Sequence, residues 1–379
     1  MKDFIKALYV DLLHRIDIVV ADINGRSIHP DIRNRFIAET NKQFSDIRDE
    51  IISTINGGDL DLPQMEGNNL YKFNGLYRTF MAIHSYRYLA IRNYDDPEIF
   101  FFKLISKIYS EHRISAIPPI VSTISNHDSY YWAVPYFEII ALPCGEEYSL
   151  LNLPDMYHEI GHLLHSMFQG KSCEISSGVI EQHFDRELVR IQDEGLGAHY
   201  ADAIDEAKYL WKESWLEEFS CDLVGAYMTG AAYGWTNLKL LSTGRGFGKI
   251  YERNESHPAD EARMRLIICM LDKLGLHQEK AEIELAWQIF LQETHPQVPK
   301  EHALLYPDYL LQHVIDEFFA FYQNADLVSY PELAQAGHLS VAQVLNKGWR
   351  QAQTNSANYY KYETDAINEL RIDFGLKEI

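Results

Sequence analysis

The chain has 379 residues, of which 46% are hydrophobic and 23% are charged, a balance typical of globular proteins with a sizeable core. It carries 34 Lys and Arg against 55 Asp and Glu, a formal net charge of -21. Nucleic acid and anionic membranes repel such a surface on average, so we expect neither as a partner.

Cysteine usage and the N-terminal segment indicate the compartment. Cys144, Cys173, Cys221 and Cys269 are far apart and form no CxxC pair, so neither a disulfide framework nor a cysteine zinc site is expected. Charged residues interrupt the apolar residues of the N-terminal segment, which therefore lacks the unbroken apolar stretch of a signal peptide. No segment approaches the ~20 apolar residues of a membrane span. We therefore expect a cytoplasmic protein.

The first region, residues 1–117, is predicted to be helical. Apolar residues recur at a four-residue step over residues 4–20 and stay near one face of a helix. Pro63 lies in a break between helical stretches, and Pro118 with Pro119 marks the end of the region.

The second region, residues 118–275, is predicted to contain a small sheet. The runs 130–134 and 136–142 are rich in aromatic and β-branched residues, which is typical of strands. Pro135 lies between the two runs and favours an edge position in the sheet, because proline cannot donate a ladder hydrogen bond.

A well-marked helix follows the predicted strands. Asn152 can cap it, Pro154 fits its first turn, and Asp155 favours the positive end of the helix dipole. The last region, residues 276–379, is predicted to be helical. The predicted fold class is therefore α+β and mostly helical, with a small sheet whose edge strand packs on the helices of the second region.

The central motif of the chain is HEIGH, an HExxH sequence formed by His158, Glu159 and His162 with Gly161 between them. Residues four apart lie on one face of a helix, so both imidazoles can meet one Zn²⁺ at ~2.0–2.1 Å. Glu159 can reach a water on the metal and take its proton as the water attacks a carbonyl. Gly161 costs the helix about 1 kcal/mol relative to Ala, and is useful if a second helix approaches closely behind the site.

A third metal ligand is expected from a long helix predicted over about residues 205–232. Glu218 and Asp222 lie one turn apart on a stripe that also carries Gly225. Glu218 is the expected ligand, and Asp222 is expected to hold a ligand histidine through its second ring nitrogen. Gly225 is expected to complement the glycine of the HExxH helix. The competing interpretation is a solvated acidic face, with Glu217 and Glu218 both exposed.

The sequence resembles the gluzincin metallopeptidases, and is most similar to the M48-like group and the small single-domain minigluzincins. The pattern is HExxH, then a Glu with an Asp four residues later, then a His-Pro pair with an Arg shortly beyond. The matching residues are His158, Glu159, His162, Glu218, Asp222, His257, Pro258 and Arg263. The resemblance covers about residues 130–275, where residues 139–143 are similar to the edge strand and turn above the cleft of such enzymes.

His257 and Arg263 are expected to complete the site. Negative charge develops on the former carbonyl oxygen during hydrolysis, so a donor opposite the metal is useful. Pro258 fits the first turn of a helix, which would fix His257 at the helix entry as that catalytic donor. Arg263 is expected to reach back to Asp222 or Glu217 and hold the third helix. The competing interpretation is a plain helix cap followed by a surface cation.

Other ligand assignments stay open. The segment HEIGHLLH also resembles the thimet-type oligopeptidases, whose Glu lies nearer to the motif, and Glu187 stands at that distance. Glu181 has the separation seen in aminopeptidases of the M1 type. The surroundings of both differ from those families. His165 is expected to lie beside the site or on the surface rather than on the metal.

The expected function is zinc-dependent hydrolysis of peptide bonds, with one Zn²⁺ per chain and Glu159 as the general base. An extended peptide is expected to pair with the edge strand around residues 136–142, so the expected partner is a peptide or protein substrate. Two alternatives remain: a zinc-binding regulatory or interaction module without turnover, and an amidase for a small non-peptide substrate. An intact Glu159 argues against the first, because a structural zinc site needs no general base.

Overall fold

The structure is a computed structural model that describes every residue except 1, 27, 29, 59, 61, 127, 169–170, 196, 244–247, 338 and 379. For residues 31, 33, 34, 171–175 and 198 it describes the backbone alone. The described part of the chain is mostly helical and contains a small three-stranded sheet. This confirms the coarse fold class predicted from the sequence.

The chain divides into two compact units. The first comprises Met1–Phe102, Pro119–Tyr130 and Tyr136–Cys144. The second comprises Lys103–Pro118, Tyr131–Pro135 and Gly145–Ile379. The regions 1–117, 118–275 and 276–379 have other boundaries and stay an interpretation of the sequence.

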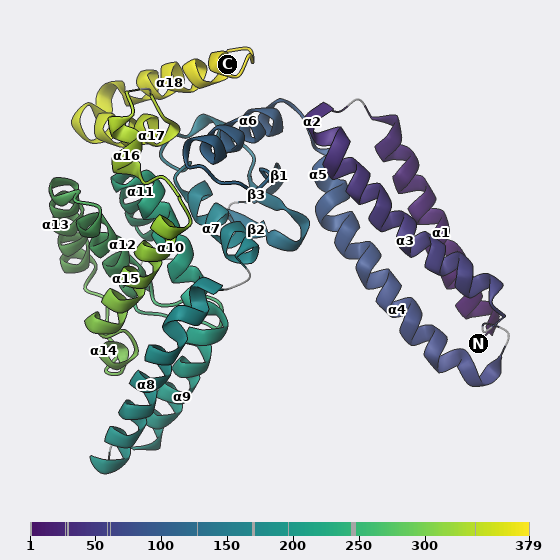
Figure 1. Cartoon of the computed structure of the whole chain (residues 1–379), viewed down its shortest axis with the longest axis horizontal. Helices are drawn as coiled ribbons and strands as arrows, with labels where there is room; N and C mark the ends of the chain where they lie inside the picture. Colours follow the sequence, from purple (N-terminus) through teal and green to yellow (C-terminus); the bar gives the residue numbers. More distant parts are fainter. Residues whose placement is uncertain are drawn as a thin grey trace. The chain divides into compact units, whose positions relative to one another are not determined.

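Long helices dominate the first unit. The helices α1 (Lys2–Gly25), α3 (Ala38–Asn56) and α4 (Glu66–Ile83) pack side by side (Figure 1). The buried stripe of α1 consists of Ile5, Tyr9, Leu12, Ile16, Val19 and Ile23. Its steps alternate between four and three residues, because a helical turn has 3.6 residues. The four-residue step predicted over residues 4–20 drifts off this stripe, and Phe4 is 59% exposed.

Shorter elements complete this part of the chain. They are α2 (Pro30–Ile32), a π-helical turn at Arg33–Ile37, a 3-10 turn at Pro63–Met65, a π-helical turn at His84–Tyr88, α5 (Leu89–Arg92) and α6 (Asp96–Glu111).

The sheet has the strand order β1-β3-β2. Strand β1 (Ile120–Ser125) pairs in parallel with β3 (Ile139–Pro143), with Ile120 opposite Ile139. Every residue of β3 is buried, as expected of a central strand that is covered on both faces. The prediction of an edge strand around residues 136–142 is therefore wrong. The edge strand next to β3 is the short β2 (Trp132–Val134), which ends where Pro135 begins a 3-10 turn.

The second unit is built from helices and short turns. In chain order these are a 3-10 turn at Glu146–Tyr148, α7 (Asp155–Met167), α8 (Lys171–Asp193), α9 (Ala198–Leu210), a π-helical turn at Trp211–Trp215, α10 (Leu216–Thr229), α11 (Ala231–Leu241), α12 (Asp260–Lys273), α13 (His277–Thr294), α14 (His302–Leu305), α15 (Asp308–Asn324), α16 (Tyr330–Gln335), α17 (Val341–Thr354), a 3-10 turn at Ser356–Asn358 and α18 (Tyr359–Asp373). Helix α10 packs on both α7 and α12, and the edge strand β2 packs on α7 (Figure 1).

Two local expectations for this unit are wrong. Asn152 does not cap α7, which starts after Pro154 without a side-chain cap, and its amide group instead donates to Glu146. The single helix predicted over 205–232 is interrupted by the π-helical turn at Trp211–Trp215 and ends at Gly230, where α10 gives way to α11.

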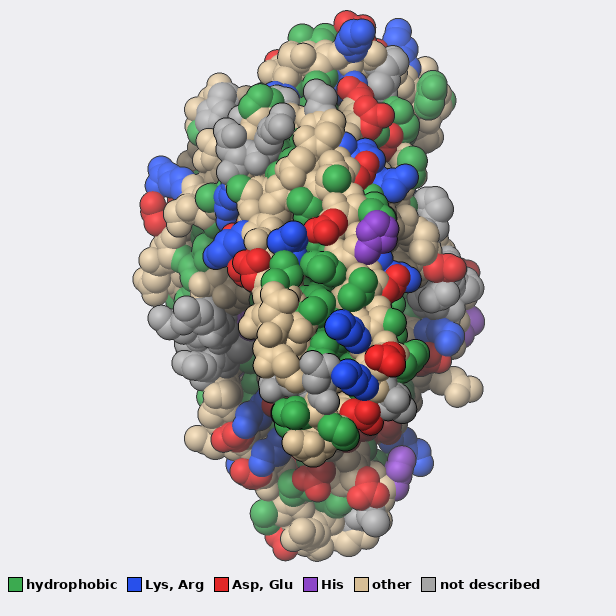
Figure 2. Space-filling view, turned by 90° about the vertical axis from the view of Figure 1, so that its right-hand side faces the viewer, with side chains coloured by type: hydrophobic (Ala, Val, Ile, Leu, Met, Phe, Trp, Pro, Cys, Tyr) green, Lys and Arg blue, Asp and Glu red, His purple; other side chains and the backbone are tan. Residues whose placement is uncertain are grey.

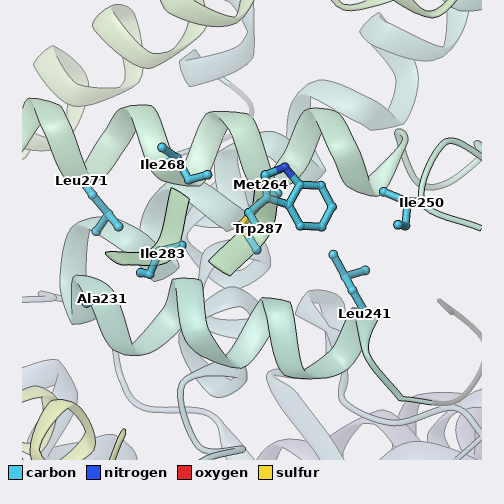
Figure 3. Packing of buried hydrophobic residues seen from close by; sticks show 8 residues of the cluster. All are labelled: Ala231, Leu241, Ile250, Met264, Ile268, Leu271, Ile283 and Trp287. Carbon is cyan, nitrogen blue, oxygen red and sulfur yellow. The ribbon is translucent and has the colours of Figure 1, made fainter. Parts of the chain in front are cut away.

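An apolar cluster holds α11, α12 and α13 together (Figure 3). Its buried members are Ala231, Leu241, Ile250, Met264, Ile268, Leu271, Ile283 and Trp287. Full burial of one such large side chain stabilises a fold by ~1.5–3 kcal/mol. The cluster therefore fixes the side chains that α11 and α12 direct elsewhere, notably Tyr233 and Arg263.

The surface and the helices bear on the expected partners. On the face shown in Figure 2, described basic and acidic side chains are interspersed among hydrophobic ones, without a large basic patch. Within the described residues, no helix combines the length and the apolar character that crossing a membrane requires.

Candidate metal centre

The helices α7 and α10 approach each other unusually closely at Gly161. A Cβ atom on Gly161 would lie 2.6 Å from Cα and 2.9 Å from Cβ of Cys221. Both distances are shorter than van der Waals contact, so a larger residue would push the two backbones apart. The expected role of Gly161, to admit a second helix behind the motif, is confirmed.

Both motif histidines point from α7 towards Glu218 on α10. Nε2 of His158 lies 3.4 Å from Oε2 of Glu218, and Nε2 of His162 lies 3.6 Å from its Oε1. Ligand atoms placed tetrahedrally at ~2.0–2.1 Å from one zinc ion are separated by about 3.4 Å. The two distances from Glu218 to the histidines are therefore compatible with one small cation held between these side chains.

Two buried carboxylate oxygens at this point make no hydrogen bond. They are Oε2 of Glu218 and Oε2 of Glu159, and both residues are less than a tenth exposed. Buried polar atoms without a partner are rare in proteins and often face an ion or water. Burial raises the pKa of Glu159 above its ordinary value. A carboxyl group shifted in this direction holds a proton more readily than an exposed one.

The charges of the histidines and Glu218 are coupled. Burial alone would raise the pKa of Glu218, but the adjacent imidazole of His158 lowers it to about 2. Burial opposes the charge on His158, yet its hydrogen bond to Asp222 and the nearby carboxylate of Glu218 raise the pKa of His158 to about 10. The carboxylate is therefore ionised, and a proton and a metal ion compete for Nε2 of His158.

A cysteine lies in the same cluster. His158, His162 and Cys221 form a group that could hold a metal ion, since one donor atom of each lies within 4.8 Å of the others. A metal requires the thiolate form of cysteine. Burial, followed by the nearby carboxylates with Glu218 first, raises the pKa of Cys221 well above its ordinary value. Without a metal, the thiol of Cys221 is therefore protonated whereas Glu218 is ionised.

Asp222 lies behind His158 and is fully buried. Its Oδ1 is 3.1 Å from Nδ1 of His158, and Arg263 donates two hydrogen bonds of 2.7 Å to its carboxylate. Burial alone would raise the pKa of Asp222, but the charge and hydrogen bonds of Arg263 hold it far below its ordinary range. An ionised carboxylate on Nδ1 orients an imidazole so that Nε2 is free for a metal.

A second carboxylate contacts His162 in the same way, although the sequence offered it only as a partner of Arg263 or as part of an exposed acidic face. Oε1 of Glu217 lies 2.8 Å from Nδ1 of His162, and its side chain is 33% exposed. Nε2 of His165 lies 3.6 Å from the other oxygen of Glu217, beside the site. The sequence contained a signal for this contact. The residue that precedes a metal-facing Glu on α10 points about 100° round the helix from that Glu. This direction leads towards His162, which lies on the later turn of α7.

Tyr233 of α11 is a further side chain of the site that the sequence did not indicate. Its hydroxyl group donates to Oδ1 of Asp222 at 2.6 Å and lies 3.1 Å from Nδ1 of His158. Gly225 was expected to complement Gly161, but this is wrong. A Cβ atom on Gly225 would lie 2.8–2.9 Å from the ring of Tyr233, so this glycine makes room for the tyrosine.

His257 faces the site from a loop. Its Nε2 lies 3.6 Å from Oε2 of Glu218, and its side chain is 49% exposed. Helix α12 starts at Asp260, so the expectation that Pro258 lies in the first helical turn is wrong. The loop is held instead by Asn254, whose side-chain oxygen accepts the backbone N–H of His257 at 2.7 Å. Burial lowers the pKa of His257, which favours the neutral imidazole.

The two alternative ligands lie on α8 and pair with cations. Glu181 accepts from Lys212 at 2.5 Å, and Glu187 accepts from Arg190 at 2.7 Å. Each has an ordinary ion-pair partner, whereas Glu218 combines deep burial with an oxygen that makes no hydrogen bond.

Comparison of the chain with protein-family models, with curated proteins and with solved structures found no match. The resemblance to gluzincins therefore stays an expectation from the sequence motifs. Any functional conclusion depends on the chemistry of the site itself.

Proposed function

We propose that this protein is a zinc-dependent hydrolase of peptide bonds. The observation that carries the proposal is the triangle formed by Nε2 of His158, Nε2 of His162 and the carboxylate of Glu218, with sides of 3.4 and 3.6 Å to the carboxylate. These residues would hold the ion. Glu159 follows His158 in the chain, is buried, and has one carboxylate oxygen that makes no hydrogen bond, so it is the candidate for the base that hydrolysis needs.

In the proposed reaction, the zinc ion and the side chains of the protein would have different roles. Zinc supplies a Lewis acid that lowers the pKa of a water to ~7 and polarises the scissile carbonyl. Glu159 takes the proton of the attacking water at its free oxygen and later returns it to the leaving amine. The burial that raises the pKa of Glu159 helps, because a group that must both take and give a proton works best near neutral pH.

His257 would stabilise the negative charge on the former carbonyl oxygen. Its Nδ1 lies 2.8 Å from Oγ of Ser256. The hydroxyl group of Ser256 donates to Oδ1 of Asn254 at 2.9 Å, so its oxygen accepts from Nδ1 of His257. Nε2, the atom that faces Glu218, can then donate when the ring is protonated. A donor of this kind, held by a fixed loop, is worth about 10²–10³ in turnover in other hydrolases.

The edge strand supports a peptide rather than a small amide as the substrate. β2 packs on α7, the helix that carries the HExxH motif. An extended peptide can pair with an edge strand through its backbone, and such pairing would hold the peptide beside the helix of the motif. We propose β2 for this role in place of residues 136–142.

Metal analysis together with one substitution tests the proposal. The purified chain should contain about one zinc, lose hydrolysis of unstructured peptides with a chelator, and recover it with Zn²⁺. Glu159→Gln should keep the zinc and lose ~10²–10⁴ of the turnover, because only the proton carrier is gone. Glu187→Gln, an acid on α8 that pairs with Arg190, is the matched control and should change neither.

Three results would count against the proposal. A Glu159→Gln variant with the turnover of the parent would exclude the mechanism. A parent chain that binds zinc but cleaves no peptide would favour the module without turnover. Cleavage of small amides alone would favour the amidase.

A further inference from the structure

We propose that Tyr233 is a positioning residue of the metal site, which holds Asp222 and the Nδ1 edge of His158 so that Nε2 of His158 faces the metal. The inference rests on the proposed zinc site. It concerns a residue that acts through two others and does not contact the substrate.

A sharp break between α10 and α11 places Tyr233 next to Asp222 and His158. α10 ends at Gly230, whose φ of 62° and ψ of -133° are open to glycine and strained for other residues. Asn346 fixes the break from both sides. Its side-chain oxygen accepts the N–H of Ala232 at 3.1 Å, and its amide group donates to the carbonyl of Thr229 at 2.7 Å. Tyr233 follows in the first turn of α11.

The ring of Tyr233 has little freedom to move. It is 2% exposed and lies against Gly225, where any Cβ atom would overlap the ring carbons. The apolar cluster of Figure 3 fixes α11 against α12 and α13. The hydroxyl group is therefore held at the end of a rigid ring on a rigid helix, as a positioning group requires.

The hydroxyl group forms a triangle with two groups behind the metal site. Oη of Tyr233 is 2.6 Å from Oδ1 of Asp222 and 3.1 Å from Nδ1 of His158, and the last two atoms are 3.1 Å apart. A tyrosine has one hydroxyl proton, and the short bond to the carboxylate uses it. The lone pairs of Oη then face His158, whose Nδ1–H is shared between two acceptors.

Asp222 accepts hydrogen bonds from Arg263 and Tyr233 as well as from His158. Its Oδ1 also accepts a hydrogen bond of 2.7 Å from Arg263, so His158 competes for an oxygen that is already occupied. Tyr233 adds a second acceptor for the Nδ1 proton and keeps the carboxylate in place. Both effects favour the tautomer that leaves the Nε2 lone pair for a metal, which raises the affinity of the site.

Tyr233→Phe tests this by removing one oxygen and keeping the ring. The affinity of the full chain for Zn²⁺, measured by competition with a chromophoric chelator, should fall ~10–100-fold, as is typical when a partner of a ligand histidine is lost. Tyr227→Phe is the matched control, because Tyr227 is also 2% exposed and donates one hydrogen bond, to the carbonyl of Leu327. The control should keep the affinity of the parent.

A second variant displaces the same hydroxyl group without deleting it. Gly225→Ala places a Cβ atom 2.8–2.9 Å from the ring of Tyr233, so it should also weaken Zn²⁺ binding. Gly178→Ala is its control, because a Cβ atom at Gly178 meets nothing within 4 Å. Thermal unfolding of the metal-free proteins verifies that every variant folds.

The outcomes separate this proposal from the proposed function. A parent chain that binds no zinc overturns both. A parent that binds zinc while Tyr233→Phe keeps its affinity overturns the role of Tyr233 alone. An equal loss in Tyr233→Phe and Tyr227→Phe also overturns it, because the effect would then follow from losing any buried hydroxyl group.

Discussion

Replacing Arg263 with Leu should destabilise the second unit by about 3–4 kcal/mol. Arg263 donates two hydrogen bonds of 2.7 Å to Asp222, which is fully buried. Removing one partner of such a pair leaves an uncompensated buried charge and costs about 3–5 kcal/mol. We expect the lower part of this range, because Tyr233 and His158 still contact Asp222.

Urea unfolding followed by tryptophan fluorescence measures this loss selectively. All six tryptophans lie in segments of the second unit, so their emission follows mainly that unit. A urea dependence of about 3 kcal/mol per molar converts the loss into a midpoint lower by about 1 M. A chelator must be present throughout, because a bound metal would add its own stabilisation.

The double variant Arg263→Leu with Asp222→Asn gives the decisive comparison. Asparagine can still accept from Tyr233 but leaves no buried charge, so the double variant should recover at least about half of the loss. A midpoint shift below about 0.3 M for Arg263→Leu would contradict an uncompensated buried charge at Asp222. A double variant as unstable as the sum of the two single variants would contradict it as well.

Two further predictions concern the ligand set and the pH dependence. Glu218→Gln should weaken Zn²⁺ binding by more than the ~10–100-fold expected when a hydrogen-bond partner of a ligand is lost. Cys221→Ala should leave Zn²⁺ binding unchanged. The opposite pattern in a chelator competition would assign the thiol of Cys221 as the ligand. Burial, followed by the charges of Arg263 and Asp222, sets the pKa of Asp260, which rises to about 6. A raised folded pKa means that ionised Asp260 opposes folding, a cost absent below about pH 3 and complete above about pH 7. Asp260→Asn should therefore stabilise the protein at about pH 7–8 by about 1–3 kcal/mol and have little effect near about pH 3. The side chain is 27% exposed and lies at a helix start, which favours the lower figure. Equal unfolding midpoints of parent and variant at pH 8 would contradict this.

The parts of the site that follow local rules could be predicted from the sequence. The four-residue spacing of His158 and His162 places both on one face of α7 whatever surrounds the helix. Gly161 indicated the close approach of a second helix because a glycine inside a helix is unfavourable without a reason. The pairing of Glu218 and Asp222 on α10 follows from the same periodicity.

The parts that depend on distant residues could not be predicted. The apolar pattern continues past residue 230, so it favoured one long helix, whereas the break at Gly230 is held by Asn346, more than a hundred residues later in the chain. The sequence therefore did not indicate that the side chain of Tyr233 contacts Asp222 and His158. The edge position predicted around residues 136–142 was wrong for a similar reason. The position of β3 in the centre of the sheet depends on its pairing with β1 and not on its own residues.

The contact between Gly161 and Cys221 has a consequence for the ionic radius that the site accepts. Backbone atoms of α7 and α10 meet there, so the distance between the helices cannot adjust as flexible side chains would. Ca²⁺ needs six to eight oxygen ligands at about 2.3–2.6 Å, a wider and more oxygen-rich shell than two imidazoles on a fixed helix spacing provide. A larger residue at position 161 would widen the gap between His158 and Glu218 without touching either. Size selection among cations would thus reside in a glycine that is not itself a ligand.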